Sequence, residues 1–118
     1  MSRRDEVHQA VRRIEQELGP IDAAIFNAGI NRPHSARNFD AKAVEQIVQT
    51  NLLSAVYGVE AVLPSMLERR SGLLVGVASV AAYRALPVAP AYGASKAALQ
   101  YLFDSLRFSL EPKGIGVA

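Results

Sequence analysis

Residues 72–99 read GLLVGVASVAAYRALPVAPAYGASKAAL, and the order of side-chain types in this stretch decides the fold. The run Leu73–Ala78 is apolar at nearly every position, which is typical of a strand covered on both faces. A loop with two prolines follows over 79–90. Over 91–111 apolar side chains then recur at helical spacing, until a Pro-Lys-Gly turn ends the pattern. The stretch therefore predicts a buried strand, a loop and a long helix.

The segments on both sides repeat this alternation of helix and strand. Four apolar side chains at helical spacing predict a helix of about four turns before Gly19, namely Val7, Val11, Ile14 and Leu18. The run Ile21–Phe26 predicts a second buried strand. A helix is predicted over 40–69, bent or ended by Pro64, and a further strand starts at Ile115. Strands separated by long helices pair in parallel.

The predicted fold class is α/β. We expect a partial Rossmann-like, doubly wound parallel sheet in a three-layer αβα arrangement, formed by residues 1–118 as a single domain. The chain is 50% hydrophobic and 20% charged, which is a globular composition.

Composition also excludes several classes of function. The net charge is +2 and the basic residues are scattered, so we expect no nucleic-acid partner. Cysteine is absent, and His8 and His34 lie in no ligand-spaced cluster, so we expect no disulfide, thiol nucleophile or metal. No run reaches the ~20 apolar residues that span a membrane, and the N-terminus has no apolar signal region. We expect a soluble cytoplasmic protein.

Polar side chains follow both predicted strands where each strand ends. The turn Asn27-Ala28-Gly29 follows the first strand, and Ser79 follows the second. In open α/β sheets, ligands bind at the carboxyl ends of the strands. Tyr92 comes thirteen residues after Ser79, and Lys96 four residues after Tyr92, which places the phenol and the ammonium on one helical face. These residues are therefore candidates for a site.

A tyrosine beside a lysine can transfer protons near neutral pH. An ammonium held ~4 Å from a phenol favours the phenolate by about 4 kcal/mol before desolvation, in an effective dielectric of about 20. Such a tyrosine can give a proton to a carbonyl oxygen or take one from a hydroxyl, and a serine hydroxyl can polarise the same oxygen. Each signal alone also has a plain structural explanation, as a turn, a cap or a solvated surface pair.

Asn51 is a polar residue inside the apolar stripe of the predicted helix 40–69. An amide in a core-facing position is costly unless it is hydrogen-bonded. It therefore either meets a buried backbone group or water, or it faces a functional cavity.

Taken together, these residues and their spacing resemble the short-chain dehydrogenase/reductase family. The resemblance rests on AAIFNAG (23–29), VQTNLLSAVYG (48–58), GLLVGVASVAA (72–82) and PAYGASKAAL (90–99). It covers essentially the whole chain, as the central segment of the family's domain. It implies an NAD(P)-binding domain and an oxidoreductase that transfers hydride between the nicotinamide of NAD or NADP and a carbonyl or alcohol substrate.

The resemblance also implies a role for each catalytic candidate. Tyr92 is the general acid/base and Ser79 holds the substrate oxygen, so both bind substrate. Lys96 favours ionisation of the tyrosine and binds the nicotinamide ribose, so Tyr92 and Lys96 also face the cofactor. Asn51 anchors a water in a proton relay.

Two further expectations come from the same resemblance. Asn27, Ala28 and Gly29 line the cofactor cleft. The helices over 40–69 and 91–111 form the main contact of a homo-oligomer.

The sequence departs from the family's pattern in one respect with physical consequences. The family opens with a strand and a Thr-Gly-x3-Gly-x-Gly loop that cradles the cofactor phosphates. Gly72 and Gly76 have the first spacing of that loop, but they lie in a strand-like run with no helix opening after it. The sheet would lack the family's N-terminal and C-terminal strands, which leaves Ile21–Phe26 as an apolar edge. We therefore expect the isolated chain to fold poorly or as an oligomer.

Other functions stay open at this point. The chain can be a catalytically inactive fragment or an oligomerisation module of the same fold. An epimerase or dehydratase would use the same tyrosine–lysine pair, although the helix pattern after Lys96 fits that reading less well. The mostly apolar loop 81–89 indicates an apolar substrate or simple packing. The sequence distinguishes neither the substrate nor NAD from NADP.

Overall fold

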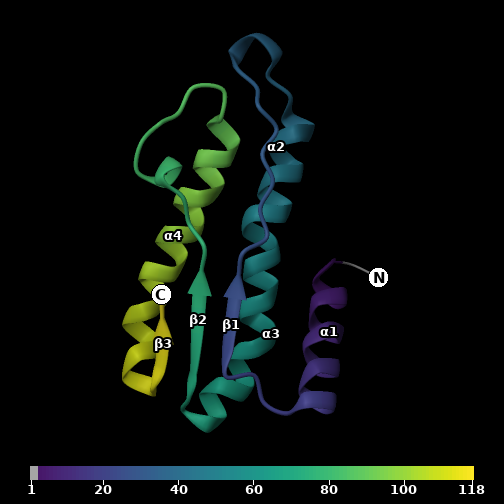
Figure 1. The fold of residues 1–118 in the computed structure, drawn as a ribbon, viewed down its shortest axis with the longest axis vertical. Coiled ribbons are helices and arrows are strands. Elements are labelled where there is room, and N and C mark those ends of the chain that lie inside the picture. Colours follow the sequence, from purple (N-terminus) through teal and green to yellow (C-terminus); the bar gives the residue numbers. More distant parts are fainter. Residues whose placement is uncertain (1–2) are drawn as a thin grey trace.

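A computed structural model of the protein describes residues 3–118 (Figure 1). Its elements are, in chain order, α1 (Arg3–Leu18), β1 (Ala23–Phe26), the short turn η1 (Ala36–Asn38), α2 (Ala41–Val48), the π-helical turn η2 (Gln49–Leu53), α3 (Ser54–Arg69), β2 (Gly72–Gly76), the turn η3 (Val80–Ala82), α4 (Pro90–Leu110), the turn η4 (Glu111–Lys113) and β3 (Ile115–Val117). The three strands form one parallel sheet in the order β1–β2–β3. The predicted partial Rossmann-like α/β class is confirmed.

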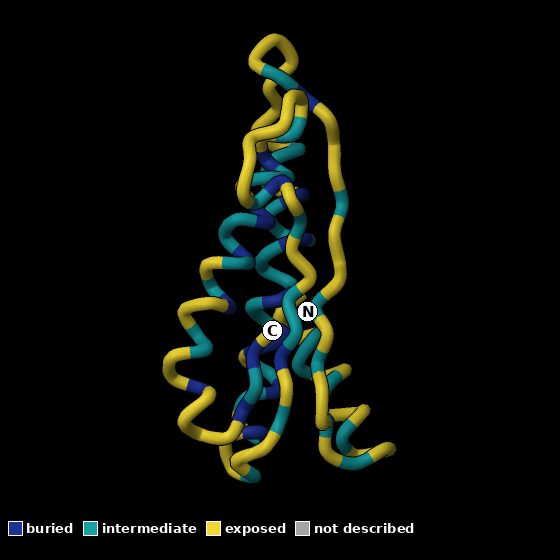
Figure 2. The backbone as a smooth tube through the Cα atoms, turned by 60° about the vertical axis from the view of Figure 1, so that its left-hand side comes forward, coloured by how far each residue is buried: buried dark blue, intermediate teal, exposed yellow. Residues whose placement is uncertain are grey.

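The core lies on one face of this sheet. The register sets Ala24, Leu74 and Val117 side by side, facing α3 and α4, where they join the hydrophobic core. The side chains at the alternate strand positions point to the opposite face of the sheet, where Ile25 is 66% exposed and Leu73 is 38% exposed. Figure 2 shows buried residues gathered between the strands and the helices. Residues 3–118 thus supply one helical layer of the αβα arrangement and leave the opposite face of the sheet uncovered.

The helix predicted over 40–69 is interrupted where Asn51 enters the core. The π-helical turn η2 separates α2 from α3, and Asn51 within it is 1% exposed. Pro64, in contrast, does not end the helix, and α3 continues through it to Arg69. Pro64 is exposed, so the carbonyl that loses its backbone donor there lies on the solvent side of the helix.

Helix α1 leaves its apolar stripe half covered. It packs mainly against α3, and none of its described residues is buried. Ile14 is 43% exposed and Leu18 83%. Val11 packs against the margin of the core, and the stripe otherwise borders a groove beside β1.

The uncovered face predicts self-association of the chain. We expect the wild-type protein to elute larger than a 12.7 kDa monomer in size-exclusion chromatography with light scattering. Ile25→Lys should shift the distribution toward the monomer, because it puts an ammonium on the apolar face. Leu18→Lys, at an exposed site on α1, is the matched control. A monodisperse, cooperatively melting wild-type monomer would contradict this prediction.

An ion-pair cluster fastens α1 to α3 and predicts an acid-sensitive contact. The Glu60 carboxylate accepts hydrogen bonds from Arg4 at 2.7 and 2.8 Å and lies 2.8 Å from His8 Nε2. The bonds from Arg4, and then from His8, lower the pKa of Glu60 from 4.5 to about 2. Because the folded-state pKa is depressed, this contribution to stability is present above pH 4.5 and is lost as the pH falls toward 2.

The test compares urea midpoints of the wild type and Glu60→Gln across this pH range. We expect the variant to be less stable near neutral pH and the two curves to converge at acid pH. Glu68→Gln removes the same charge from the same helix and should show no such convergence. A difference between wild type and Glu60→Gln that is independent of pH would count against the ion pair.

Candidate active site

Tyr92 and Lys96 lie on the first turns of α4, at the carboxyl end of the sheet. Pro90 occupies the first turn, where its missing N–H costs no helical hydrogen bond. The four-residue spacing then stacks the two side chains, with Lys96 Nζ 5.9 Å from the centroid of the Tyr92 ring. The predicted juxtaposition of phenol and ammonium is therefore present in the structure.

The Lys96 ammonium is buried without a carboxylate partner among residues 3–118, which is unusual for a charged side chain. Lys96 is 4% exposed, and its Nζ donates a 2.9 Å hydrogen bond to the carbonyl of Val77, just past β2. No carboxylate pairs with it in the described part of the chain. An ammonium has three donors, so one bond to Val77 leaves two for a ligand or water. A buried cation without a counter-ion is costly, which makes Lys96 a candidate site residue.

Asn51 ties the loop after β1 to α4. Its Oδ1 accepts from the backbone N–H of Ile30 at 2.7 Å, and its Nδ2 donates to the Ile30 carbonyl at 2.9 Å. The same Nδ2 donates to Ser95 Oγ at 3.1 Å, and Ser95 Oγ donates to the Tyr92 carbonyl at 2.7 Å. The buried backbone partner expected from the sequence is observed, and Asn51 also lines the groove described below.

Ser95 is the residue of this network that sequence reasoning did not single out. It is 2% exposed and links Asn51 to the turn that carries Tyr92. The available signal was a serine in the apolar stripe of the helix, beside Lys96, which is the argument that identified Asn51.

Ser79 lies where β2 gives way to the loop before α4. Its Oγ accepts a 3.2 Å hydrogen bond from the N–H of Ala81 and caps the turn η3. That turn packs against the start of α4 so closely that a Cβ added at Gly93 would lie 3.2 Å from the Ala81 carbonyl oxygen. Ser79 therefore belongs to the segment packed on the turn of Tyr92, with its hydroxyl proton free to point to another acceptor.

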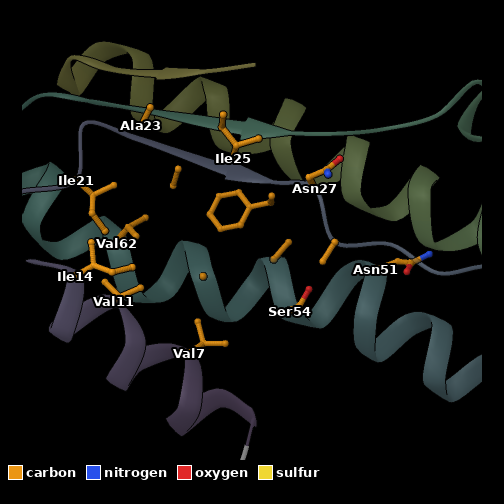
Figure 3. A pocket seen from close by; sticks show the side chains of 15 residues that line it. Val7, Val11, Ile14, Ile21, Ala23, Ile25, Asn27, Asn51, Ser54 and Val62 are labelled. Atoms are coloured by element: carbon orange, nitrogen blue, oxygen red, sulfur yellow. The ribbon is translucent and has the colours of Figure 1, made fainter.

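The turn Asn27-Ala28-Gly29 divides between two surroundings. Asn27 and Ala28 line a groove of about 450 Å³ between β1 and the helices α1 and α3 (Figure 3). Gly29 instead approaches the lysine, and a Cβ added there would lie 3.3 Å from Lys96 Nζ and 3.8 Å from Asn51 Oδ1. Asn51 touches both surroundings, so the turn joins the groove to the lysine.

The groove of Figure 3 is mainly apolar and is distinct from the tyrosine–lysine pair. Val7, Val11 and Ile14 point into it from α1, and Asn27 and Ser54 lie toward its polar end. Tyr92, Lys96 and Ser79 do not line it. The candidate catalytic residues therefore lie at the strand ends, apart from this groove, which is a mainly apolar surface beside β1.

The residues at the strand ends fit one part of a nicotinamide dinucleotide. A buried ammonium with free donors suits the hydroxyl oxygens of a ribose, and the bare Cα of Gly29 lets such a ligand come close to it. Within residues 3–118, no glycine-rich turn opens a helix to cradle phosphates. The fit therefore concerns the nicotinamide end of the cofactor.

The described residues give no sign of two other kinds of site. Among residues 3–118 there is no group of three or more His, Asp or Glu side chains able to hold a metal ion. None of the helices described is both long and apolar enough to cross a membrane.

Comparison with known proteins assigns the chain to a family. The short chain dehydrogenase family model matches residues 1–118, and the chain belongs to that family. An uncharacterized oxidoreductase of Myxococcus xanthus is 37% identical over 99% of this chain and 46% of its own length. The chain thus spans about half of that relative.

Two solved structures show the same architecture. The apo form of LigO from Sphingobium sp. superposes with a TM-score of 0.94 at 29% identity, covering 100% of this chain and 45% of that one. A gluconate 5-dehydrogenase from Burkholderia cenocepacia, in complex with NADP and tartrate, gives a TM-score of 0.92 at 26% identity, covering 97% and 45%. The predicted family and the Rossmann-like fold are confirmed.

Proposed function

We propose that this chain carries the proton-transfer half of an NAD(P)-dependent oxidoreductase acting on a carbonyl/alcohol pair. The observation that carries the proposal is the buried, carboxylate-free ammonium of Lys96 stacked one turn from the phenol of Tyr92. Family membership and the NADP bound to the gluconate 5-dehydrogenase support a nicotinamide cofactor. The carbonyl or alcohol itself stays unassigned.

In the proposed mechanism the chain's own groups handle the proton. The nicotinamide, when bound, supplies or accepts the hydride. During reduction Tyr92 gives its phenolic proton to the carbonyl oxygen, and Ser79 Oγ–H donates a hydrogen bond to the same oxygen. The Lys96 ammonium then stabilises the phenolate that remains. In the oxidative direction the same groups act in reverse.

Asn51 acts in this proposal by holding the site together. Its side chain is already bonded to Ile30 and Ser95, and Ser95 is bonded to the Tyr92 carbonyl. The π-helical turn at this position disturbs the regular pattern of helical hydrogen bonds, as such turns often do at functional sites. Any relay water would therefore be held by the main chain of this turn, in place of the amide.

The proposal is tested by following NADH and NADPH oxidation by the chain with a panel of carbonyl compounds. Calorimetric titration of both cofactors accompanies the assay, so that binding and turnover are measured separately. We expect cofactor binding and substrate-dependent oxidation. Failure to bind either cofactor would overturn the proposal.

Gly29→Ala offers a steric test of the cofactor position. The added methyl would come within 3.3 Å of Lys96 Nζ and occupy the side from which a ribose would approach. We expect the cofactor Kd to rise roughly tenfold, the equivalent of about 1.4 kcal/mol. The thermal midpoint should change little, because residue 29 is exposed. Unchanged cofactor affinity in a folded Gly29→Ala variant would place the cofactor elsewhere.

A non-catalytic oligomerisation module is the second candidate, and an exposed apolar stripe favours it. Tyr101 and Phe108, seven residues apart on α4, are 78% and 85% exposed, and Leu67 on α3 is 37% exposed. These residues lie on the helices expected to form a homo-oligomer. Phe108→Glu, with light scattering as the readout, tests this surface. An oligomer that persists in wild type without any cofactor binding would favour the module over the enzyme.

A further inference from the structure

His34 lies at the meeting point of the two loops that leave the carboxyl ends of β1 and β2. It is 4% exposed, although most of the loop around it is exposed. Its backbone N–H donates a 3.0 Å hydrogen bond to the carbonyl of Val88, in the loop before α4. Segments 54 residues apart in the sequence are joined here by a single backbone hydrogen bond.

The hydrogen bonds of the imidazole fix its tautomer. Nδ1 lies 2.8 Å from the Arg32 carbonyl oxygen, which can only accept, so Nδ1 carries a proton. Nε2 is buried and has no hydrogen-bond partner among residues 3–118. The ring also packs edge-on against Phe39, with centroids 5.6 Å apart. A buried nitrogen without a hydrogen-bond partner costs free energy. The other contacts of His34 must therefore offset the cost of Nε2.

Val88, which His34 contacts, has an unusual backbone conformation. Its φ is 56°, in the left-handed region that a β-branched residue rarely adopts. Such a left-handed conformation is disfavoured relative to the ordinary ones by roughly fivefold to a hundredfold. It therefore persists only where the surrounding structure stabilises it. The Val88 side chain is 55% exposed, so packing does not impose the conformation. Val88 lies in a turn after Pro87, and the contact that reaches it from another segment is the backbone hydrogen bond from His34 to its carbonyl.

The loop held in this way borders the proposed site. It starts at Ser79 and ends at Pro90, two residues before Tyr92. It also forms one wall of a cavity of about 360 Å³, whose other wall is the first turns of α4, including Gly93 and Ala97. A shift at Val88 would therefore move the loop end next to Tyr92 and reshape this cavity.

We propose that His34 is a positioning residue that holds segment 83–90, through Val88, in a conformation this segment does not adopt by itself. We call the bonds from His34 to Arg32 and Val88 the His34 clasp. Its importance for substrate entry rests on the proposed function, since it assumes that substrate reaches Tyr92 past segment 83–90; the cavity of about 360 Å³ itself is not lined by Tyr92, Lys96 or Ser79. The clasp itself is a property of the fold and is testable without cofactor.

His34→Phe separates the clasp from simple packing. Phenylalanine keeps the ring volume against Phe39 and the backbone N–H that bonds the Val88 carbonyl, but it loses the Nδ1 bond to the Arg32 carbonyl that orients residue 34, and it removes the unsatisfied Nε2. A purely space-filling role therefore predicts an unchanged or tighter loop. The clasp predicts a looser one, measured as the rate of trypsin cleavage after the exposed Arg84. We expect cleavage to be roughly tenfold faster than in wild type. His8→Phe, at the other histidine, is the control and should leave the rate unchanged.

Two further measurements complete the test. In Val88→Gly the left-handed conformation is no longer strained, so adding His34→Phe should change cleavage less than about twofold. Nitrogen-15 NMR of the wild-type protein should show the neutral His34 as the Nδ1–H tautomer, whether or not the variants fold. A rate for His34→Phe within about twofold of wild type, or an Nε2–H tautomer, would overturn the proposal. None of these readouts involves turnover, so failure of the proposed oxidoreductase activity would leave them unaffected.

Discussion

Tyr92→Phe should lower the rate of nicotinamide-dependent carbonyl reduction by about 10²- to 10⁴-fold, the usual range for loss of a positioned general acid. The substitution removes one oxygen and leaves the ring beside Lys96 Nζ, 5.9 Å from its centroid. No hydrogen bond of the described network uses the phenolic oxygen, since Ser95 bonds the Tyr92 carbonyl. Fold and cofactor affinity should therefore be retained, and the loss should fall on kcat.

Tyr101→Phe provides the matched control for this prediction. Tyr101 lies on the same helix, is 78% exposed and belongs to a surface stripe. Its substitution should leave the rate of NADPH oxidation unchanged. Equal rates for wild type and Tyr92→Phe, in the presence of turnover, would remove Tyr92 from the chemistry.

Asn51→Leu should be the most destabilising single change at the site. The isosteric apolar side chain leaves the Ile30 N–H and carbonyl without partners and removes the bond to Ser95. Each unsatisfied buried group costs about 1–3 kcal/mol, so we expect a loss of about 2–5 kcal/mol in the free energy of unfolding. Urea denaturation measures it directly.

Gln46, an exposed amide on the preceding helix, provides the control for Asn51→Leu. Gln46→Leu makes the same change of chemistry on the exposed face of the preceding helix and should cost less than about 0.5 kcal/mol. If Asn51→Leu were as stable as the wild type, the amide would not hold the loop after β1. Its retention would then have to be explained by the reaction alone.

The sequence predicted those parts of the fold that depend on local patterns. Apolar runs identified the strands β1 and β2, and helical periodicity identified α1 and α4, because burial on a sheet or helix imposes those spacings. The Tyr92–Lys96 juxtaposition followed from a spacing of four residues on one helix, and the burial of Asn51 from its position in an apolar stripe.

The features that the sequence left undetermined depend on contacts between distant segments. The Lys96 ammonium donates its hydrogen bond to the carbonyl of Val77, nineteen residues away. This partner depends on where α4 crosses the end of β2. The left-handed conformation of Val88 is unusual for a β-branched residue, and the hydrogen bond to its carbonyl comes from His34 in another loop. The effect of Pro64 was also misjudged in part, because a proline on the exposed side of a helix need not end it.

The uncovered face of the sheet is separate from the exposed stripe on α4. Ile25 on that face and Phe108 on α4 are both exposed, but they belong to different surfaces of the molecule. Self-association through the sheet would therefore be relieved by Ile25→Lys and not by Phe108→Glu. The two variants together distinguish sheet-mediated association from the helix-mediated oligomer expected of the family.

The most direct test of the central claim follows the hydride itself. The chain is incubated with NADPH deuterated at C4 of the nicotinamide and with the panel of carbonyl compounds, and the alcohol products are analysed by mass spectrometry. We predict deuterium on the carbinol carbon for the wild-type protein and at least ~100-fold less for Tyr92→Phe. Labelled alcohol formed at equal rates by both proteins, or by neither, would contradict the assignment of this strand-end cluster as a proton-transfer site.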